Sequence, residues 1–145
     1  MKALVIYYSF TGNTRKVAEA MAAELGADLK QVRDEVNPQD YNLICIGTPV
    51  YGSSCAWPVK RFLRRLPRLD NKKIAAFCTM ASTGDEGAFR FIRKAVEEKG
   101  ASFLGGFSCP GGTSPLLFFG PKLMARGHPD EQDLERCREF ARGLK

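Results

Sequence analysis

The chain has 145 residues and a formal net charge of +6, from 22 Lys and Arg against 16 Asp and Glu. This length predicts one domain, residues 1–145, with a core of its own. The five cysteines are odd in number and none are spaced Cys-x-x-Cys, which argues against a disulfide framework or a zinc site and favours a reducing compartment.

The first predicted element is the apolar strand of residues 3–8, too short for a signal-peptide core or a membrane span, so we expect a cytoplasmic protein without a span. Apolar residues at helical spacing follow from Val17 to Leu25, and Gly26 closes that helix. Further strands are predicted over 27–33, 42–47, 73–79 and 102–109, and further helices from Pro58, over 86–99 and over 130–144.

Alternation of five strands with helices predicts an α/β fold, a doubly wound parallel sheet with helices on both faces. Ligands of such sheets lie beyond the carboxyl ends of the strands, where the strand order reverses. Three predicted loops meet at that edge: residues 9–14, 48–57 and 79–86.

The loop SFTGNT, residues 9–14, joins the first strand to the first helix. Unpaired N–H groups at a helix N-terminus, hydroxyl donors and a glycine suit a phosphate group. The loop lacks both GK[ST] and GxGxxG, so a phosphate monoester fits better than a triphosphate or a dinucleotide. An ordinary Ser/Thr helix cap is the alternative.

SFTGNT directly after the first strand resembles the phosphate loop of flavodoxins, T/S-x-T-G-x-T, and GTPVYG, residues 47–52, resembles their second flavin loop. The resemblance covers the whole chain and implies five strands in the order 2-1-3-4-5 with noncovalent FMN. The cofactor-binding residues it implies are Ser9, Phe10, Thr11, Gly12, Asn13 and Thr14 at the phosphate, and Thr48, Pro49, Val50, Tyr51, Gly52, Thr79, Met80, Ala81, Ser82, Thr83, Gly84 and Asp85 beside the flavin ring.

An aromatic residue of the second loop usually covers one flavin face in this family, and Tyr51 falls there, with Trp57 as the alternative. The third loop, TMASTGDEG, has no aromatic residue, so the other flavin face is expected to be open or covered by Met80. His128 precedes Pro129 at a helix start and is expected to be a neighbour of the cap, so no catalytic residue is predicted.

The chain also departs from the family pattern in its basic overall charge and in one apolar loop. Residues 60–73 hold seven cations and one acid, a pattern that indicates either a solvated helix face or a surface that attracts acidic partners or nucleic acid. The loop 110–129 is unusually apolar and is expected to pack as core, to cover the flavin or to dock a partner.

The resemblance implies an electron carrier that passes low-potential electrons between redox partner proteins. The alternative is an FMN-dependent oxidoreductase that acts on a small quinone or a porphyrinogen. Nucleic-acid binding is not expected, because the chain has no base-stacking motif beside its basic helix. The sequence leaves the oligomeric state open.

Overall fold

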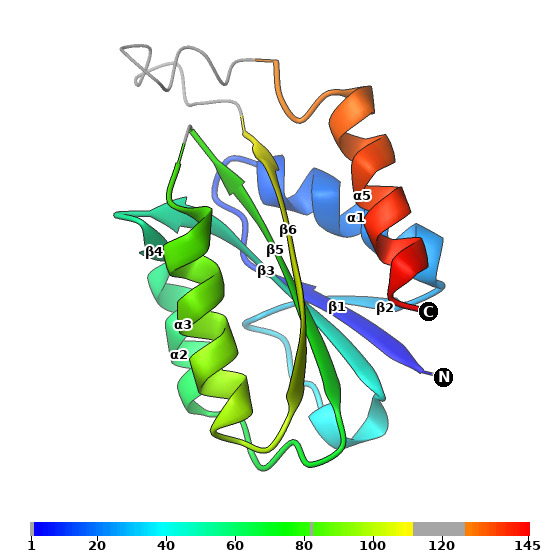
Figure 1. Cartoon of the computed structure of the whole chain (residues 1–145), viewed down its shortest axis with the longest axis vertical. Coiled ribbons are helices and arrows are strands. Elements are labelled where there is room, and N and C mark those ends of the chain that lie inside the picture. The colour runs from blue at the N-terminus through cyan, green and yellow to red at the C-terminus, as the bar shows by residue number, and fades with distance from the viewer. Residues whose placement is uncertain (1, 82, 112–126) are drawn as a thin grey trace.

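A parallel sheet lies at the centre of the computed structural model, which describes residues 2–81, 83–111 and 127–145 (Figure 1). Its strands follow the order β2-β1-β3-β5-β6, which confirms the predicted order 2-1-3-4-5. The strands are β1 (Ala3–Tyr7), β2 (Asp28–Gln31), β3 (Leu43–Tyr51), β5 (Lys73–Met80) and β6 (Ser102–Pro110). A short strand, β4 (Ser54–Cys55), pairs antiparallel with β3 and was not predicted.

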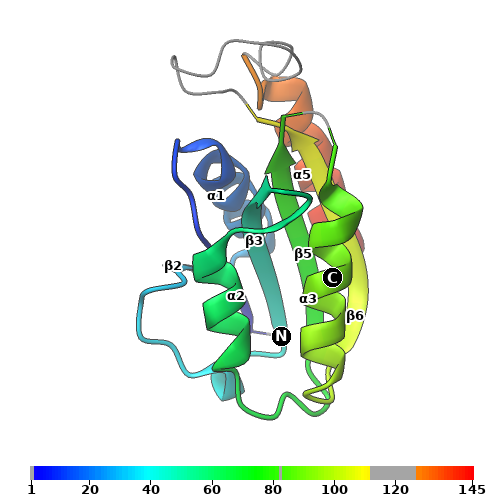
Figure 2. The same ribbon diagram turned by 90° about the vertical axis from the view of Figure 1, so that its left-hand side faces the viewer.

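Helices cover both faces of the sheet, because right-handed crossovers between parallel strands place them there. Figures 1 and 2 show α1 and α5 on one face and α2 and α3 on the other. The helices are α1 (Asn13–Leu25), α2 (Trp57–Arg64), α3 (Asp85–Glu97) and α5 (Glu131–Gly143), with a 3-10 turn, η1 (Pro38–Asp40). None of these described helices combines the length and the apolar character needed to cross a membrane.

Each central strand supplies side chains to two cores. Along β1, Leu4 and Ile6 pack on the α2 and α3 face, while Val5 and Tyr7 pack on the α1 and α5 face. All four are buried, which is why this strand reads as a continuous apolar run and not as an alternating one.

The largest difference from the predicted elements is at the end of β3. This strand was expected to end at residue 47, but it continues to Tyr51 and turns back through Gly52 and Ser53 into β4. Both turn residues have positive φ, 56° and 60°, the backbone of a two-residue hairpin turn. Residues 48–51, predicted as a loop, therefore belong to a strand, and we call residues 50–55 the β3–β4 hairpin.

The other strand ends lie within two residues of the predicted ones; β2, for example, was predicted over 27–33 and is confined to Asp28–Gln31. Strand β6 contains a bulge, since Ile74 pairs with Phe103 but Ala75 pairs with Gly105. Leu104 is the extra residue, and Gly105 has a φ of 137°. Most of the apolar loop 110–129 lies outside the described residues, as does Ser82.

The N-terminus of α5 is held by a buried carboxylate. Asp130 and Asp133 form a capping box, in which each side chain accepts a hydrogen bond from the other's backbone N–H. Asp133 is only 1 % exposed; its carboxylate also contacts Nδ1 of His128, at 2.6 Å, and the guanidinium of Arg136. His128 is thus a neighbour of the cap, as predicted.

The pKa of Asp133 results from opposing effects. Burial raises it, but the hydrogen bonds from His128 and the N–H of Asp130, together with the charges of His128 and Arg136, bring it below the ordinary value of 3.8. A lowered pKa means that the ionised form stabilises the fold. That stabilisation is complete above the ordinary pKa and is lost as the pH falls through the lower folded-state pKa.

Asp133→Asn is therefore expected to lower the free energy of unfolding at pH 7 by about 1.5–3 kcal/mol, the usual contribution of hydrogen bonds to a charged group. The difference from the unsubstituted protein should shrink in strongly acid solution. Urea unfolding of both proteins at several pH values measures this difference in the free energy of unfolding. Asp130→Asn is the control, because asparagine caps helices as well as aspartate does. A difference independent of pH would contradict this assignment.

Candidate cofactor site

A small hollow lies at the N-terminus of α1, where the phosphate was predicted. It has a volume of about 180 Å³ and is lined by Tyr7, Ser9, Phe10, Gly12, Arg15 and Gln31. Gly12 precedes the helix with a φ of 94°, and within the described residues no side chain caps α1. The first turn of α1 also contains no acid. The positive end of the helix dipole is therefore available to an anion.

Two side-chain hydrogen bonds shape this loop. The N–H of Gly12 donates to Oγ of Ser9 at 3.0 Å, and Nδ2 of Asn13 donates to Oγ1 of Thr11 at 3.0 Å. Thr11 and Phe10 are exposed, Phe10 by 73 %. The hydroxyls of Ser9 and Thr11 are thus held on the loop beside the helix end, as the phosphate prediction requires.

Arg15 and Gln31 line the hollow although the sequence motif did not indicate them. Arg15 lies one residue beyond SFTGNT, and Gln31 ends β2, which pairs with β1. Only the strand pairing brings Gln31 to the loop. Arg15 adds a cation to a loop that contains none, although Glu19 lies 3.7 Å from its guanidinium and offsets part of that charge.

A buried hydroxyl pair connects the first and third predicted loops. Oγ1 of Thr14, at the start of α1, lies 2.8 Å from Oγ1 of Thr79, near the end of β5. Both residues are buried, and a Cβ built on Gly111 would lie 3.0 Å from Cβ of Thr79. A threonine hydroxyl both donates and accepts, so this pair leaves hydrogen-bonding capacity for a ligand.

The second predicted loop is fixed by another threonine. Oγ1 of the buried Thr48 donates to the carbonyl of Pro49 at 2.8 Å and accepts from the N–H of Ala56 at 2.9 Å. Thr48 therefore ties the end of β3 to the start of α2 across the β3–β4 hairpin. Its structural role is to position the hairpin residues Val50, Tyr51 and Gly52.

The two aromatic candidates for ring stacking are both partly exposed, Tyr51 by 49 % and Trp57 by 58 %. Partial burial raises the pKa of Tyr51, and the neighbouring Tyr8 raises it further. Trp57 already has a partner, because the guanidinium of Arg64 lies 5.0 Å from its ring centroid. Tyr51 presents its exposed ring at the tip of the hairpin, where the family resemblance expects the stacking residue.

The third predicted loop and the start of α3 pack closely against the β3–β4 hairpin. A Cβ on Gly84 would lie 2.7 Å from the Val50 side chain, and a Cβ on Gly87 would overlap the backbone carbonyl of Ser53. Asp85 begins α3 and accepts a hydrogen bond from Oγ of Ser108 at 2.9 Å. Met80 and Ala81 are half-buried and Thr83 is exposed. The second and third loops thus form one wall at the carboxyl edge of the sheet.

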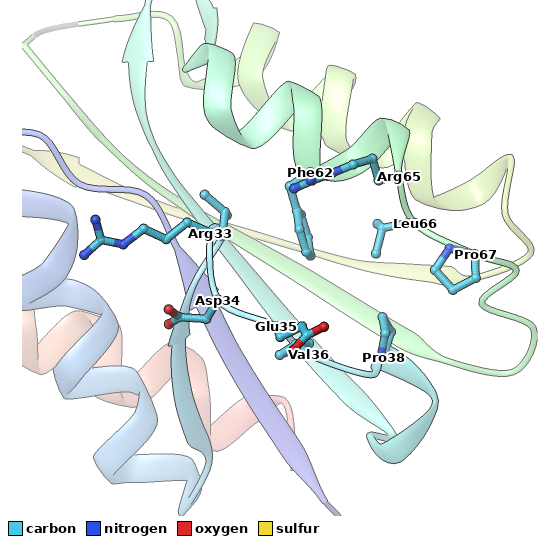
Figure 3. A pocket seen from close by; sticks show the side chains of 10 residues that line it. Arg33, Asp34, Glu35, Val36, Pro38, Phe62, Arg65, Leu66 and Pro67 are labelled. Carbon is cyan, nitrogen blue, oxygen red and sulfur yellow. The ribbon is translucent and has the colours of Figure 1, made fainter.

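A larger hollow, about 490 Å³, lies elsewhere, between the segment after β2 and helix α2. Figure 3 shows Phe62 and Leu66 pointing from the α2 side toward Val36 and Pro38. Its charged lining consists of two cations, Arg33 and Arg65, and two acids, Asp34 and Glu35. None of the predicted site residues lines it, so this hollow is separate from the candidate cofactor site.

Comparison with known proteins gives the family of this chain. Residues 4–114 match the family described as flavodoxin domain. The chain belongs to the flavodoxin domain family. This flavodoxin-family chain is 32% identical to an uncharacterised protein of Methanocaldococcus jannaschii, MJ0298, over 99% of this chain and 98% of that protein. It is 30% identical to the flavodoxin-like domain-containing protein BilS of Clostridioides difficile, over 99% of this chain and 96% of BilS.

The fold also resembles a solved flavoprotein of Lactobacillus acidophilus in complex with FMN. That structure has a TM-score of 0.65 and 23% identity, covering 74% of this flavodoxin-family chain and 92% of the other. The donor set here fits such a phosphate monoester, because an uncapped helix end, the hydroxyl of Ser9 and Arg15 lie at a hollow that Gly12 also lines, and the exposed Thr11 lies on the same loop. Gly12 has no side chain, and among the described residues, its two chain neighbours aside, none lies within 4 Å of the place where its Cβ would be.

Proposed function

We propose that this chain binds FMN and carries electrons between redox partner proteins. The observation that carries the proposal is the uncapped N-terminus of α1, which faces a hollow with hydroxyl donors and one arginine. Membership of the flavodoxin domain family and the FMN found in the Lactobacillus acidophilus flavoprotein support it.

The chain's own residues would divide the binding of FMN between two ends of the site. The loop 9–14, with Arg15, would hold the phosphate through backbone N–H groups, hydroxyls and one charge. The β3–β4 hairpin, with Tyr51, and the segment 79–85 would enclose the flavin ring. When bound, FMN supplies the oxidation and reduction chemistry, and the protein orients it and limits the access of water.

The alternative function is an FMN-dependent oxidoreductase acting on a small quinone or a porphyrinogen. One observation favours it: the third loop, residues 79–87, contains no aromatic residue to cover the second flavin face. The planar ring of a quinone could stack there. Turnover of a quinone with a nicotinamide donor, faster than electron exchange with proteins, would select this alternative over the carrier.

The test of the proposal is the identity of the bound flavin. The purified protein, or the protein reconstituted with free flavins, should be yellow and release FMN on denaturation, as identified by chromatography. The loop is suited to a terminal phosphate, so FAD should bind more weakly. Recovery of FAD alone, or failure to bind FMN, would refute the proposal.

Tyr51→Leu is expected to raise the dissociation constant for FMN by about 5- to 10-fold, because aromatic stacking contributes on the order of 1 kcal/mol. Trp57→Leu is the matched control and should change it less than about 2-fold, since Trp57 already stacks on Arg64. Flavin fluorescence titration measures both. The opposite ranking would assign the stacking role to Trp57.

A further inference from the structure

The solvent face of α2 carries only positive charge. Its sequence, WPVKRFLR, contains no acid, and Val59, Phe62 and Leu63 face the core. Arg61, Arg64 and the following Arg65 are exposed. Among the described residues, no carboxylate lies within ion-pair distance of Lys60, Arg61, Arg64 or Arg65. The positive charge of these side chains is therefore not neutralised by an ion pair within the described part of the chain.

A groove of about 390 Å³ runs between this helix and α3, which lies beside it in Figure 2. Its apolar lining is Leu63, Phe91 and Ala95. Its charged lining is Arg64, Lys94 and Lys99 against the single acid Glu98. Nζ of Lys60 lies 5.0 Å from the ring centroid of Phe91 and adds a further cation at the groove.

The groove lies along the C-terminal parts of α2 and α3, and the opposite ends of these two helices adjoin the candidate cofactor site. Helix α2 begins directly after the β3–β4 hairpin, and α3 begins directly after the segment 79–84. Arg64 connects the two regions, because it lines the groove and also lies over the ring of Trp57 near the start of α2. A protein docked in the groove and along α2, whose eight residues span about 12 Å, would therefore reach the hairpin that carries Tyr51.

We propose that the α2–α3 groove docks an acidic redox partner protein, whose carboxylates face Arg64 and Lys94 while an apolar side chain packs against Phe91. This proposal rests on the proposed function, because it assigns the partner of the same site. Charge complementarity argues for the acidic partner, since three lining cations face one lining acid. The apolar floor argues for a protein, because a nucleic acid backbone offers phosphates but no aliphatic anchor.

The experiment uses an acidic [2Fe–2S] ferredoxin as the probe and compares two double variants. Arg64→Glu with Lys94→Glu alters the groove. Lys30→Glu with Lys145→Glu alters β2 and the C-terminus, and it changes the net charge by the same amount. Long-range steering by net charge is thus equal in the two variants, and only the position of the charge differs.

Two measurements are made at low salt. In the first, the ¹⁵N-labelled protein as purified is titrated with oxidised ferredoxin, and broadening should concentrate on the amides of α2 and α3. In the second, stopped-flow spectroscopy follows the transfer of one electron from the reduced ferredoxin cluster to bound FMN. The second-order rate constant should fall about 10-fold or more in the groove variant and less than about 2-fold in the control, and it should fall as salt is added.

The outcomes separate the two proposals. A protein that binds no FMN refutes the proposed function, whereas the titration still tests docking. Equal losses in both variants, broadening outside α2 and α3, no reaction with ferredoxin, or preferential binding of a double-stranded oligonucleotide to the groove would overturn the docking proposal. FMN affinity and the reaction with dithionite should be the same in all three proteins.

Discussion

Thr11→Asp is expected to weaken FMN binding by about 100-fold or more, because a carboxylate placed beside a phosphate repels it by several kcal/mol at the effective dielectric of a protein surface. Thr11 is exposed and stands between Phe10 and Gly12, which both line the hollow at α1. Riboflavin, which lacks the phosphate, should bind the variant nearly as well as it binds the unsubstituted protein. Fluorescence titration with both flavins measures the two affinities.

Thr11→Asn is the matched control, since asparagine has nearly the shape of aspartate without its charge. It should weaken FMN by no more than about 10-fold, the loss of one charge-assisted hydrogen bond. Equal losses for FMN and riboflavin in Thr11→Asp would show that the loop does not contact the phosphate. Equal losses in the Asp and Asn variants would show that charge is not the cause.

Gly87→Ala is expected to destabilise the protein by about 1–3 kcal/mol through overpacking, although alanine is favoured over glycine inside a helix by about 1 kcal/mol. Gly87 lies in α3, and the added Cβ would overlap the backbone carbonyl of Ser53 in the β3–β4 hairpin. A backbone carbonyl in a two-residue turn has little freedom to move aside. Relieving this overlap would displace the hairpin, so the affinity for FMN should fall together with the stability of the protein.

Gly143→Ala is the control for helix propensity. Gly143 is the last residue of α5, and a Cβ there meets nothing within 4 Å. This substitution should leave the stability unchanged or raise it by up to about 1 kcal/mol. Urea unfolding monitored by circular dichroism compares the two. A Gly87→Ala protein more stable than the unsubstituted one would show that the hairpin is not packed tightly on α3.

The strands and the helices were predictable because their signals are local and strong, whereas the sheet order came from the resemblance to flavodoxins. The strand at residues 3–7 is buried on both faces and therefore appears as one apolar run, and α1 ends at Gly26, which has the positive φ of a helix C-cap. The loop 9–14 could be singled out as a candidate phosphate site for the same reason, since its hydroxyls and Gly12 stand between a clear strand and a clear helix.

Features that depend on long-range packing were not predictable. The β3–β4 hairpin was missed because β4 has only two residues and Pro49 and Gly52 in the preceding stretch are typical of loops. Gln31 reaches the hollow at the N-terminus of α1 only through pairing of β2 with β1. Gly87 looks like an unfavourable helix residue until the carbonyl of Ser53 is found against it. The basic segment 60–73 was apparent in the sequence, but the groove beside α2 could not be predicted because it depends on where α3 packs.

The bulge in β6 affects how this sheet meets other copies of the chain. A straight edge strand with open N–H and C=O groups is a template on which another strand can add and start aggregation. In β6, Leu104 falls outside the ladder with β5 and is 43 % exposed, and Gly105 bends the backbone beside it. An incoming strand would lose its register at this point. The bulge therefore discourages sheet extension along an edge that includes an exposed leucine.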